Sequence, residues 1–436
     1  MALKKVLIIS YYWPPSGGIG VLRNLKFVKY LRNFDWEPIV FVPENADYPY
    51  LDEGNFRDIP DNVQVIKYPI REPFRLFKIL TNRKNTPLNN IVHVKDKQTW
   101  FDNLAIWIRG NFFIPDARAL WIKPAVGFLV NYLRENPVDA ILTDGPPHTN
   151  TVIGTQVAQK TGIPYLADFQ DPWTQVDYYK LFKIGKRADR IHKKLEQETF
   201  HTARKITIAS PTWKKDLMAI GAKDVEVIYY GYDEDDFAAL KVQPDAFFTF
   251  THAGLLGTDR NPDNFLQAFA ALNQELPGFK EFARIKLIGQ IDHTVLQNIQ
   301  ALGLQEQVVQ LGTLPRKQTL QELVNSWVLL LPLNKADNVG GRMPGKFYEY
   351  IRANRPVMSL GPTGTDIEYI MKQYELGENF PWEDTRHIKE FMQRQYHFFQ
   401  QQQFKHDSER PDYSVFSNFN QTKKLAGLLH EISTTK

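Results

Sequence analysis

The chain has 436 residues, of which 43% are hydrophobic and 23% are charged, and it contains no cysteine. Its length exceeds one ordinary hydrophobic core and predicts two domains of roughly 200 residues each, while the composition excludes a disordered chain. The formal net charge of +4 gives no sign of nucleic-acid binding, and the missing cysteine excludes disulfides, thiolate metal sites and thiol catalysis.

The first 31 residues have the pattern of a buried strand, a glycine loop and a helix. Residues 6–9 form a continuous apolar run, which predicts a strand buried on both faces. We do not expect a signal peptide, because the segment YYWPPSGGIG follows at once. Gly17 and Gly18 join the strand to the helix, where a phosphate is favoured, and a structural turn is the alternative. Arg23 stands where a dinucleotide fingerprint needs glycine, so the loop is not that fingerprint.

A basic segment follows two further predicted strands at residues 38–42 and 63–66. Residues 67–97 hold eight basic and two acidic residues, a net charge of +6, with large apolar side chains between them. This pattern is typical of a segment that lies on an anionic membrane surface, and a solvated lid or loop is the alternative. No apolar run approaches the ~20 residues needed to span a bilayer.

Aromatic residues cluster directly after the basic segment. We expect them to pack a helical insertion, and the alternative is that some of them line a substrate site. The cluster consists of Trp100, Phe101, Trp107, Phe112, Phe113 and Trp121.

Two consecutive predicted strands, at residues 138–143 and 163–168, run into polar residues. His148 follows the first strand, and Asp168 and Asp171 follow the second. Because parallel strands bring their carboxyl ends to one edge of a sheet, where open α/β folds bind ligands, these three residues are candidates for function. The alternatives are that His148 caps the next helix and that the aspartates are turn or cap residues.

A second alternation of strands and helices begins at residue 247. It follows a charged helix at 186–204, strands at 205–210 and 225–231, and the acidic run 233–236. We interpret that run as a solvated linker, with a metal-binding Asp-x-Asp as the alternative. Strands are predicted at 248–253, 285–289, 308–312, 328–333 and 356–360, with a seam between two domains near 230–246. The tail 416–432 has helical periodicity and is long enough to pack back on the first domain.

Residues 338–361, NVGGRMPGKFYEYIRANRPVMSLG, have the pattern of a glycine loop, a helix from about Pro344 and a strand. The loop and the helix N-terminus then lie at the carboxyl edge of a parallel sheet, where phosphate is attracted. Lys346 lies in the first helical turn, where positive charge opposes the helix dipole, so helix stability does not explain it. Glu349 lies one turn later and could accept hydrogen bonds from sugar hydroxyls. The alternative is a solvated Lys–Glu face.

Together these segments resemble glycosyltransferase family 4, over most of the chain and in the same order. The similar segments are VLIISYYWPPSGGIG, EVIYYGYDEDDF, FTHAGLLGTDRNPDNFLQAF and GKFYEYIRANRPVMSLG, with GPPHTN and ADFQDPW resembling acceptor-side loops of a bacterial subgroup. The resemblance implies the α/β fold named GT-B, with two Rossmann-like domains facing each other across a cleft. It implies an acceptor-side domain at 1–230, a hinge at 231–246 and a donor domain at 247–414, with residues 415–436 packing back on the first domain.

The resemblance also implies roles for single residues at the donor site. Gly17 and Gly18 would lie near the donor diphosphate, Arg260 would bind the diphosphate, and Glu349 would bind the ribose. The family's sugar-binding glutamate is replaced by Gly341, so backbone N–H groups or Arg342 would take over its contacts.

Two further departures from the family pattern concern a basic residue and a histidine. The basic residue expected after Gly254 is Leu255, whose charge Lys346 would replace. The histidine found beside the reaction centre in some members is Gln170 here.

The function implied by the resemblance is retaining, metal-independent transfer of a sugar from a nucleotide-diphosphate sugar, a co-substrate rather than a cofactor. The acceptor would be a glycan or lipid-linked molecule of bacterial cell-surface polysaccharide synthesis, oriented by His148, Asp168 and Asp171. The chain would be cytoplasmic, with peripheral contact at the inner membrane face through 67–97. The alternatives are a nucleotide-sugar epimerase of the same fold and a non-catalytic nucleotide-sugar-binding protein.

Overall fold

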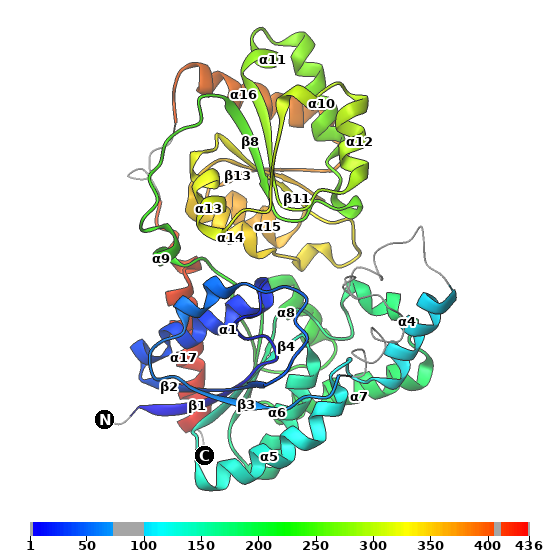
Figure 1. The fold of residues 1–436 in the computed structure, drawn as a ribbon, viewed down its shortest axis with the longest axis vertical. Helices are drawn as coiled ribbons and strands as arrows, with labels where there is room; N and C mark the ends of the chain where they lie inside the picture. Colours follow the sequence, from blue (N-terminus) through cyan, green and yellow to red (C-terminus); the bar gives the residue numbers. More distant parts are fainter. Residues whose placement is uncertain (1–2, 73–99, 405–410, 435–436) are drawn as a thin grey trace. The chain divides into compact units, whose positions relative to one another are not determined.

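The computed structural model describes residues 3–72, 100–404 and 411–434. The chain forms two compact units, one of Met1–Tyr230 with Asn418–Lys436 and one of Gly231–Ser417. We call them the N-terminal unit and the C-terminal unit. Each contains one sheet of parallel strands flanked by helices (Figure 1). The predicted α/β class with two parallel, Rossmann-like sheets is confirmed.

The sheet of the N-terminal unit has seven strands in the order β3-β2-β1-β4-β5-β6-β7. From β1, the strands β2 and β3 follow one another toward one edge of the sheet. The chain then returns to the other side of β1 with β4 and continues to the opposite edge, as in the Rossmann arrangement. The strands are β1 (Lys4–Ile9), β2 (Trp36–Pro43), β3 (Gln64–Tyr68), β4 (Ala140–Gly145), β5 (Tyr165–Phe169), β6 (Lys205–Ile208) and β7 (Val225–Val227).

Alternate side chains of β1 enter two separate cores, one on each face of this sheet. Leu7 and Ile9 pack in the core that holds α5 (Ile122–Glu135) and α6 (His148–Thr161). Val6 and Ile8 pack in the core that holds α1 (Ile19–Tyr30) and α17 (Asn418–Thr434). A strand buried on both faces needs a continuous apolar run, which explains why residues 6–9 predicted it. The predicted packing of the chain's tail on the first domain is confirmed.

The remaining helical segments of the N-terminal unit connect these strands. They are η1 (Leu31–Phe34), η2 (Glu53–Asp58), α4 (Trp100–Phe112), η4 (Ala119–Trp121), η5 (Asp177–Phe182), α7 (Lys186–Thr202) and α8 (Pro211–Ala219).

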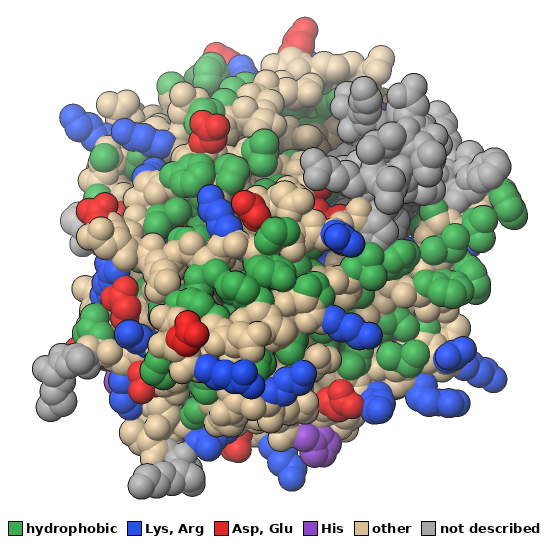
Figure 2. Space-filling view, turned by 60° about the horizontal axis from the view of Figure 1, so that its bottom comes forward, with side chains coloured by type: hydrophobic (Ala, Val, Ile, Leu, Met, Phe, Trp, Pro, Cys, Tyr) green, Lys and Arg blue, Asp and Glu red, His purple; other side chains and the backbone are tan. Residues whose placement is uncertain are grey.

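Helix α4 packs one face on its own unit and exposes another. Gly110 approaches η5 so closely that a Cβ atom would lie 2.6 Å from the carbonyl oxygen of Phe182, so a larger residue would push the helix away. Figure 2 shows hydrophobic side chains reaching the surface on the side where α4 lies in Figure 1. The exposed apolar residues of α4 share one helical face at positions i, i+4, i+7, i+8 and i+12. They are Trp100, Leu104, Trp107, Ile108 and Phe112.

The sheet of the C-terminal unit has six strands in the order β10-β9-β8-β11-β12-β13. The order again reverses once, here between β8 and β11. The strands are β8 (Phe248–Ala253), β9 (Ala283–Ile288), β10 (Val308–Gly312), β11 (Val328–Pro332), β12 (Val357–Leu360) and β13 (Gly377–Phe380).

The helical segments of the C-terminal unit cover both faces of this sheet (Figure 1). They are α9 (Glu234–Phe237), η6 (Thr258–Arg260), α10 (Asp263–Glu275), α11 (Phe279–Phe282), α12 (His293–Ala301), η7 (Gln305–Gln307), α13 (Arg316–Asn325), η8 (Val339–Gly341), α14 (Gly345–Ala353), α15 (Asp366–Gln373), α16 (Thr385–Gln400) and η10 (Ser414–Phe416). Over the described residues, no helix is long and apolar enough to cross a membrane.

Candidate functional site

The order reversal in the C-terminal unit brings the end of β8 beside the segment that follows β11. Open α/β sheets bind ligands at such a switch point, outside the carboxyl ends of the strands. The chain leaves β8 through Gly254, whose φ of 110° is unfavourable for other residues. A Cβ atom on Gly254 would lie 3.0 Å from Nζ of Lys346, so the absence of a side chain leaves room for this ammonium group.

The buried His252 and the partly buried Lys346 form a polar pair at this point. Nδ1 of His252 lies 3.0 Å from the carbonyl oxygen of Leu330, and Nε2 lies 3.3 Å from Nζ of Lys346. A carbonyl can only accept a hydrogen bond, so Nδ1 carries the proton and Nε2 accepts from the ammonium group. Burial, and then the charge of Lys346, holds the pKa of His252 well below its usual range. The neutral histidine therefore orients the lysine.

Lys346 interacts electrostatically with two of the other charged candidates of this unit, Arg260 and Glu349. Burial, and then the charge of Arg260, lowers the pKa of Lys346 to about 7, while Glu349 opposes the shift. A lysine whose charge is this costly is stabilised by an anion placed beside it. Lys346, Arg260 and Glu349 thus form one electrostatic cluster, and Lys346 lies beside Gly254, the residue before Leu255. A fully solvated Lys–Glu face does not describe this pair.

Arg260 is held by the residue before it in η6. Its Nε and Nη2 donate to the two carboxylate oxygens of Asp259 at 3.1 and 2.8 Å. The carbonyl oxygen of Asp259 accepts from the N–H group of Lys335 at 2.7 Å, which ties this turn to the segment after β11. About a quarter of the Arg260 side chain remains exposed, so the guanidinium group is accessible to a ligand.

Glu349 is bound by an arginine that the sequence analysis did not single out. Arg316, in the first turn of α13, donates from Nη1 to Glu349 and from Nε to Asp236 at 3.0 Å. The interpretation of residues 233–236 as solvated holds for Glu234 and Asp235, which are exposed, and is wrong for Asp233 and Asp236, which are buried. Only 2% of the Asp236 side chain is exposed, and Asp233 caps α9 by accepting from the N–H group of Asp235. Burial is tolerated because an ion pair compensates the Asp236 charge.

Gly341 and Arg342 lie at the end of η8, just before α14. Gly341 is buried, Arg342 is partly buried, and the N–H group of Arg342 donates to the carbonyl oxygen of Val339 at 3.0 Å. The backbone at this point is therefore engaged in its own turn.

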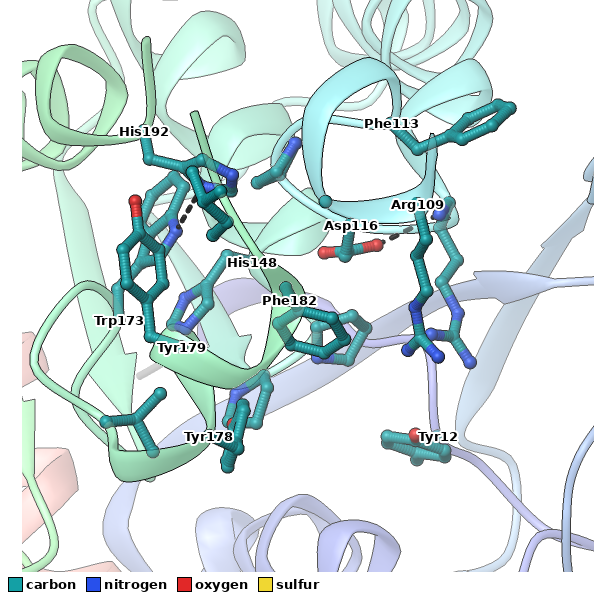
Figure 3. A pocket seen from close by; sticks show the side chains of 17 residues that line it. Tyr12, Arg109, Phe113, Asp116, His148, Trp173, Tyr178, Tyr179, Phe182 and His192 are labelled. Carbon is teal, nitrogen blue, oxygen red and sulfur yellow. Dashed lines mark hydrogen bonds between the residues drawn. The ribbon is translucent and has the colours of Figure 1, made fainter. Parts of the chain in front are cut away.

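The N-terminal unit contains a cavity of about 280 Å³ at its own switch point. Tyr12 comes from the segment after β1, and Pro146, Pro147 and His148 come from the segment after β4. Further walls come from α4, the segment before η4, η5 and α7. Figure 3 shows Arg109 and Tyr12 toward one side of the cavity, with His148, Trp173 and Tyr179 toward the other. Concave, mostly apolar pockets with a few polar groups are typical ligand sites.

His148 is the candidate of this unit that lines the cavity. Its ring stacks on Trp173 with centroids 4.5 Å apart and an angle of 3° between the planes. Burial, and then the neighbouring His192, lowers the pKa of His148 to about 3, so the imidazole is neutral at physiological pH. Nδ1 of His148 is buried and has no hydrogen-bond partner within residues 3–72, 100–404 and 411–434. A neutral imidazole can accept a hydrogen bond from a hydroxyl group but is a weak general base.

Asp168 lies inside the unit, where it pairs with Arg23. The guanidinium group donates from Nε and Nη2 to the two carboxylate oxygens at 2.6 and 2.7 Å, and the Thr207 hydroxyl donates at 2.5 Å. Nη1 of Arg23 also donates to the carbonyl oxygens of Ile228 and Tyr229. This geometry joins α1, β5, β6 and the end of the unit, so Asp168 acts on a ligand only through its neighbours.

Asp144 is a buried carboxyl group that was not among the candidates, although its segment was. It lies beside Asp168 across β4 and β5 and accepts from Asn150 at 2.8 Å. Burial raises the pKa of Asp144 to about 8, with Asp168 adding to the rise. Gln170, which stands at the histidine position of some family members, donates to Asp144 at 3.4 Å.

Asp171, Gly17 and Gly18 complete the candidates of this unit. Asp171 is partly buried, and its charge contributes to holding the pKa of Tyr230 well above its usual range, after burial. Gly17 and Gly18 lie between β1 and α1, where Gly18 has a φ of 87°. The N–H group of Gly17 donates to the carbonyl oxygen of Tyr50 at 2.9 Å, so this N–H group is engaged in the loop.

Solved structures with the same fold cover nearly the whole chain. The Anabaena protein HepE, in complex with UDP and glucose, has a TM-score of 0.60 and 15% identity over 98% of this chain and 100% of that chain. The lipopolysaccharide outer core galactosyltransferase WaaB has a TM-score of 0.56 and 13% identity, over 98% of this chain and 99% of that chain. A putative UDP-N-acetylglucosamine 2-epimerase from Listeria monocytogenes has a TM-score of 0.56 and 12% identity, over 100% of this chain and 98% of that chain.

The fold is GT-B. No protein-family model and no curated protein matches the sequence. The similarity to solved structures therefore establishes the fold, and the GT-B assignment expected from the sequence is confirmed, while membership of family 4 stays a prediction.

Proposed function

We propose that this chain is a retaining glycosyltransferase of family 4, acting without a metal. It would transfer a sugar from a nucleotide-diphosphate sugar to a glycan or lipid-linked acceptor in bacterial cell-surface polysaccharide synthesis. The observation that carries the proposal is the cluster of Lys346, Arg260 and Glu349 at the switch point of the C-terminal unit. Its lysine has a lowered pKa, which an anion such as a diphosphate would relieve.

The chemistry needs stabilisation of the departing nucleoside diphosphate. Lys346 and Arg260 supply positive charge where the β8 and β11 segments meet, and such preorganised charge is usually the largest electrostatic contribution to catalysis. Glu349 would bind the ribose. Because Arg316 now binds the same carboxylate, ribose binding shares or displaces that contact.

The acceptor would bind in the cavity of the N-terminal unit. His148, neutral and stacked on Trp173, can accept a hydrogen bond from the attacking hydroxyl group, and Asp171 would help to orient it. Asp168 would position this edge of the sheet through its ion pair with Arg23. In a retaining reaction the leaving phosphate would assist deprotonation of the acceptor, so a strong protein base is not needed.

A nucleotide-sugar panel separates transfer from its alternatives, one of which is favoured by the structural similarity to the Listeria epimerase. UDP-, GDP-, ADP- and dTDP-sugars are incubated with and without glycan and lipid-linked acceptors, and free diphosphate and sugar isomers are measured. Diphosphate release only with an acceptor supports transfer. Isomerisation without release supports an epimerase, and binding without turnover supports a non-catalytic protein.

Substitutions at the donor cluster test the site itself. Arg260→Ala and Glu349→Ala should each lower turnover at least tenfold, about 1.4 kcal/mol of transition-state stabilisation. Arg386→Ala is a matched control, because this exposed arginine of α16 forms an ion pair with Glu390 one turn away on the same helix. Wild-type rates in both site variants would contradict the assignment.

We further propose cytoplasmic localisation with peripheral contact at an anionic membrane. The segment proposed for this contact, 67–97, lies outside the described residues from position 73 onward. The exposed apolar face of α4 follows directly in the chain and adds side chains suited to the interface. Liposomes with anionic lipid should sediment the protein at low salt, and the double variant Trp107→Ser, Phe112→Ser should weaken this. Absence of sedimentation at low salt would exclude the contact.

A further inference from the structure

The cavity of the N-terminal unit has two guanidinium groups in its wall. Arg109 comes from the last turn of α4, and Arg118 lies just before η4. Arg109 lies over the ring of Phe182, 5.1 Å from its centroid, and Arg118 lies over the ring of Tyr11 at 4.4 Å. Burial, and then the charge of Arg118, lowers the pKa of Arg109 to about 10. Arg118 is thus close enough to disfavour the charge of Arg109. Burial also disfavours the charge of Arg118, but Tyr12, Tyr11, Asp116 and Glu72 outweigh burial and raise its pKa.

The nearby carboxylates are engaged mainly by other groups. Asp116 accepts from the N–H group and the hydroxyl of Thr149 at 2.8 and 2.9 Å, which caps the start of α6. Glu72 accepts from the hydroxyl of Tyr11 at 2.7 Å, and its ion pair with Arg118 spans 3.7 Å. Nε of Arg118, the atom that faces Glu72 in this ion pair, is buried and has no hydrogen-bond partner among the described residues. A buried guanidinium donor without a partner costs free energy unless a ligand supplies the acceptor.

The other side of the cavity presents flat aromatic surfaces. Trp173 stacks with His148 and donates from Nε1 to Nδ1 of His192 at 3.1 Å, which fixes the ring. Tyr178 and Tyr179 line the same region (Figure 3). The negative faces of such rings attract the polarised C–H groups of a saccharide ring. The volume, about 280 Å³, lies near the lower end of ligand-pocket sizes and suits a single ring with one substituent.

We propose that this cavity binds an acceptor saccharide that carries an anionic group, a phosphate ester or a carboxylate, held by Arg109 and Arg118. The proposal rests on the proposed function in one respect, namely that the ligand of this unit is the acceptor. Arginine pairs with planar carboxylates and with phosphates through two parallel hydrogen bonds, which gives both affinity and orientation. The anion would fix the ring against the aromatic side, with a hydroxyl group toward His148.

Direct binding tests the proposal without any transfer assay. The intact protein is titrated calorimetrically with glucose, glucuronate, glucose 6-phosphate and inorganic phosphate, and UDP is titrated separately. At least one of the two anionic sugars should bind at least tenfold more tightly than glucose. The preference between glucuronate and glucose 6-phosphate shows whether the anionic group is a carboxylate or a phosphate. If inorganic phosphate binds as tightly as the preferred anionic sugar, the saccharide part of the proposal is overturned.

Variants at the arginines identify the site. Arg118→Gln and Arg109→Gln should each weaken binding of the preferred anionic sugar at least tenfold and leave UDP binding unchanged. Arg118→Lys keeps the charge but cannot donate the two parallel hydrogen bonds of a guanidinium group. Its affinity should lie between those of Arg118→Gln and the wild type. Arg134→Gln, an exposed arginine of α5, is the matched control. Circular dichroism and the melting temperature show whether each variant is folded. If a variant is not folded, the affinities of the wild-type protein for glucose and for the two anionic sugars still test the proposal.

The outcomes distinguish this proposal from the proposed function. Equal affinity for glucose and both anionic sugars would overturn the anionic acceptor, even if nucleotide sugars are turned over. Arginine-dependent binding of an anionic sugar without any turnover of nucleotide sugars would support the site and contradict the transferase. In a working transfer assay, Arg118→Gln should raise the KM for the acceptor and leave the KM for the donor unchanged.

Discussion

At the scale of single residues, Lys346 shows how burial turns an ordinary lysine into a titrating group near neutral pH. Its hydrogen bond to His252 does not compensate the ammonium charge, because a neutral imidazole supplies a lone pair and no charge, and Glu349 offsets the effect of burial only in part. Arg260 adds a repulsive charge. An incoming diphosphate would compensate both cations at once.

Affinity for a nucleotide sugar should therefore depend on pH around neutrality. The pKa of Lys346 is about 7 in the protein, so the lysine is charged below pH 7 and loses its proton as the pH rises through this value. Binding of the diphosphate favours the charged form, so the affinity for UDP-glucose should fall about tenfold between pH 6 and pH 8.5. Calorimetric titration measures this, since the diphosphate diester keeps its charge throughout the range.

Substitution assigns that pH dependence to one group. Lys346→Met should bind UDP-glucose more weakly than wild type at pH 6 and with nearly the same affinity at both pH values. Lys317→Met, an exposed lysine of α13, should retain the wild-type dependence. A wild-type affinity that is equal at pH 6 and 8.5 would show that Lys346 is not a diphosphate ligand.

The structure brings together three residues that the sequence singled out in the C-terminal unit, Lys346, Arg260 and Glu349. It separates those of the N-terminal unit, where His148 lines the cavity and Asp168 does not. Lys346 was conspicuous because positive charge in a first helical turn opposes the dipole. Asp168 had an equally suggestive place after a strand, yet it forms a buried ion pair with Arg23, 145 positions away in the chain. A partner at that separation has no local signature, so an aspartate at a strand end could be recognised while its partner could not.

At the scale of elements, the buried strands were predictable, and one strand at a sheet edge was not. β1, β4 and β11 are continuous apolar runs buried on both faces, and each lies within one or two residues of its predicted limits. β13, Gly-Glu-Asn-Phe at the edge of its sheet, was missed because its sequence has little strand preference. It pairs through its backbone with β12, which no side-chain pattern shows.

The helical insertion at 100–121 was predicted, but the two roles of its aromatic residues were not separated. Trp121 is 1% exposed and stacks on Phe41 in the core, whereas Phe113 lines the cavity and Trp107 is exposed. Which face a helix buries depends on its neighbours. Here the close approach of Gly110 to Phe182 sets the helix orientation, and this contact brings Arg109 into the cavity wall.

At the scale of the whole molecule, the N-terminal unit is completed by the last helix of the chain. α17 packs against α1, and Leu425, Leu429 and Ile432 are almost fully buried in the core shared with β1 and β2. The N–H group of Tyr229 donates to Gln421 at 2.7 Å, and Asn418 donates to the carbonyl oxygen of Tyr230 at 2.6 Å. The N-terminal unit thus depends on residues that follow the whole C-terminal unit in sequence.

Weakening α17 should therefore destabilise the beginning of the chain. Leu429→Ala removes a fully buried side chain from the core of β1 and β2, at a cost of about 2–5 kcal/mol. Hydrogen exchange followed by mass spectrometry should show faster exchange of β1 and β2 peptides, with β8 and β11 peptides of the C-terminal unit unchanged, because the lost contacts belong to one unit. Lys423 is exposed on the same helix, so Lys423→Ala should leave the protection of the β1 and β2 peptides and of the β8 and β11 peptides unchanged. Unchanged protection of β1 and β2 in Leu429→Ala would mean that the first 230 residues hold their core without α17.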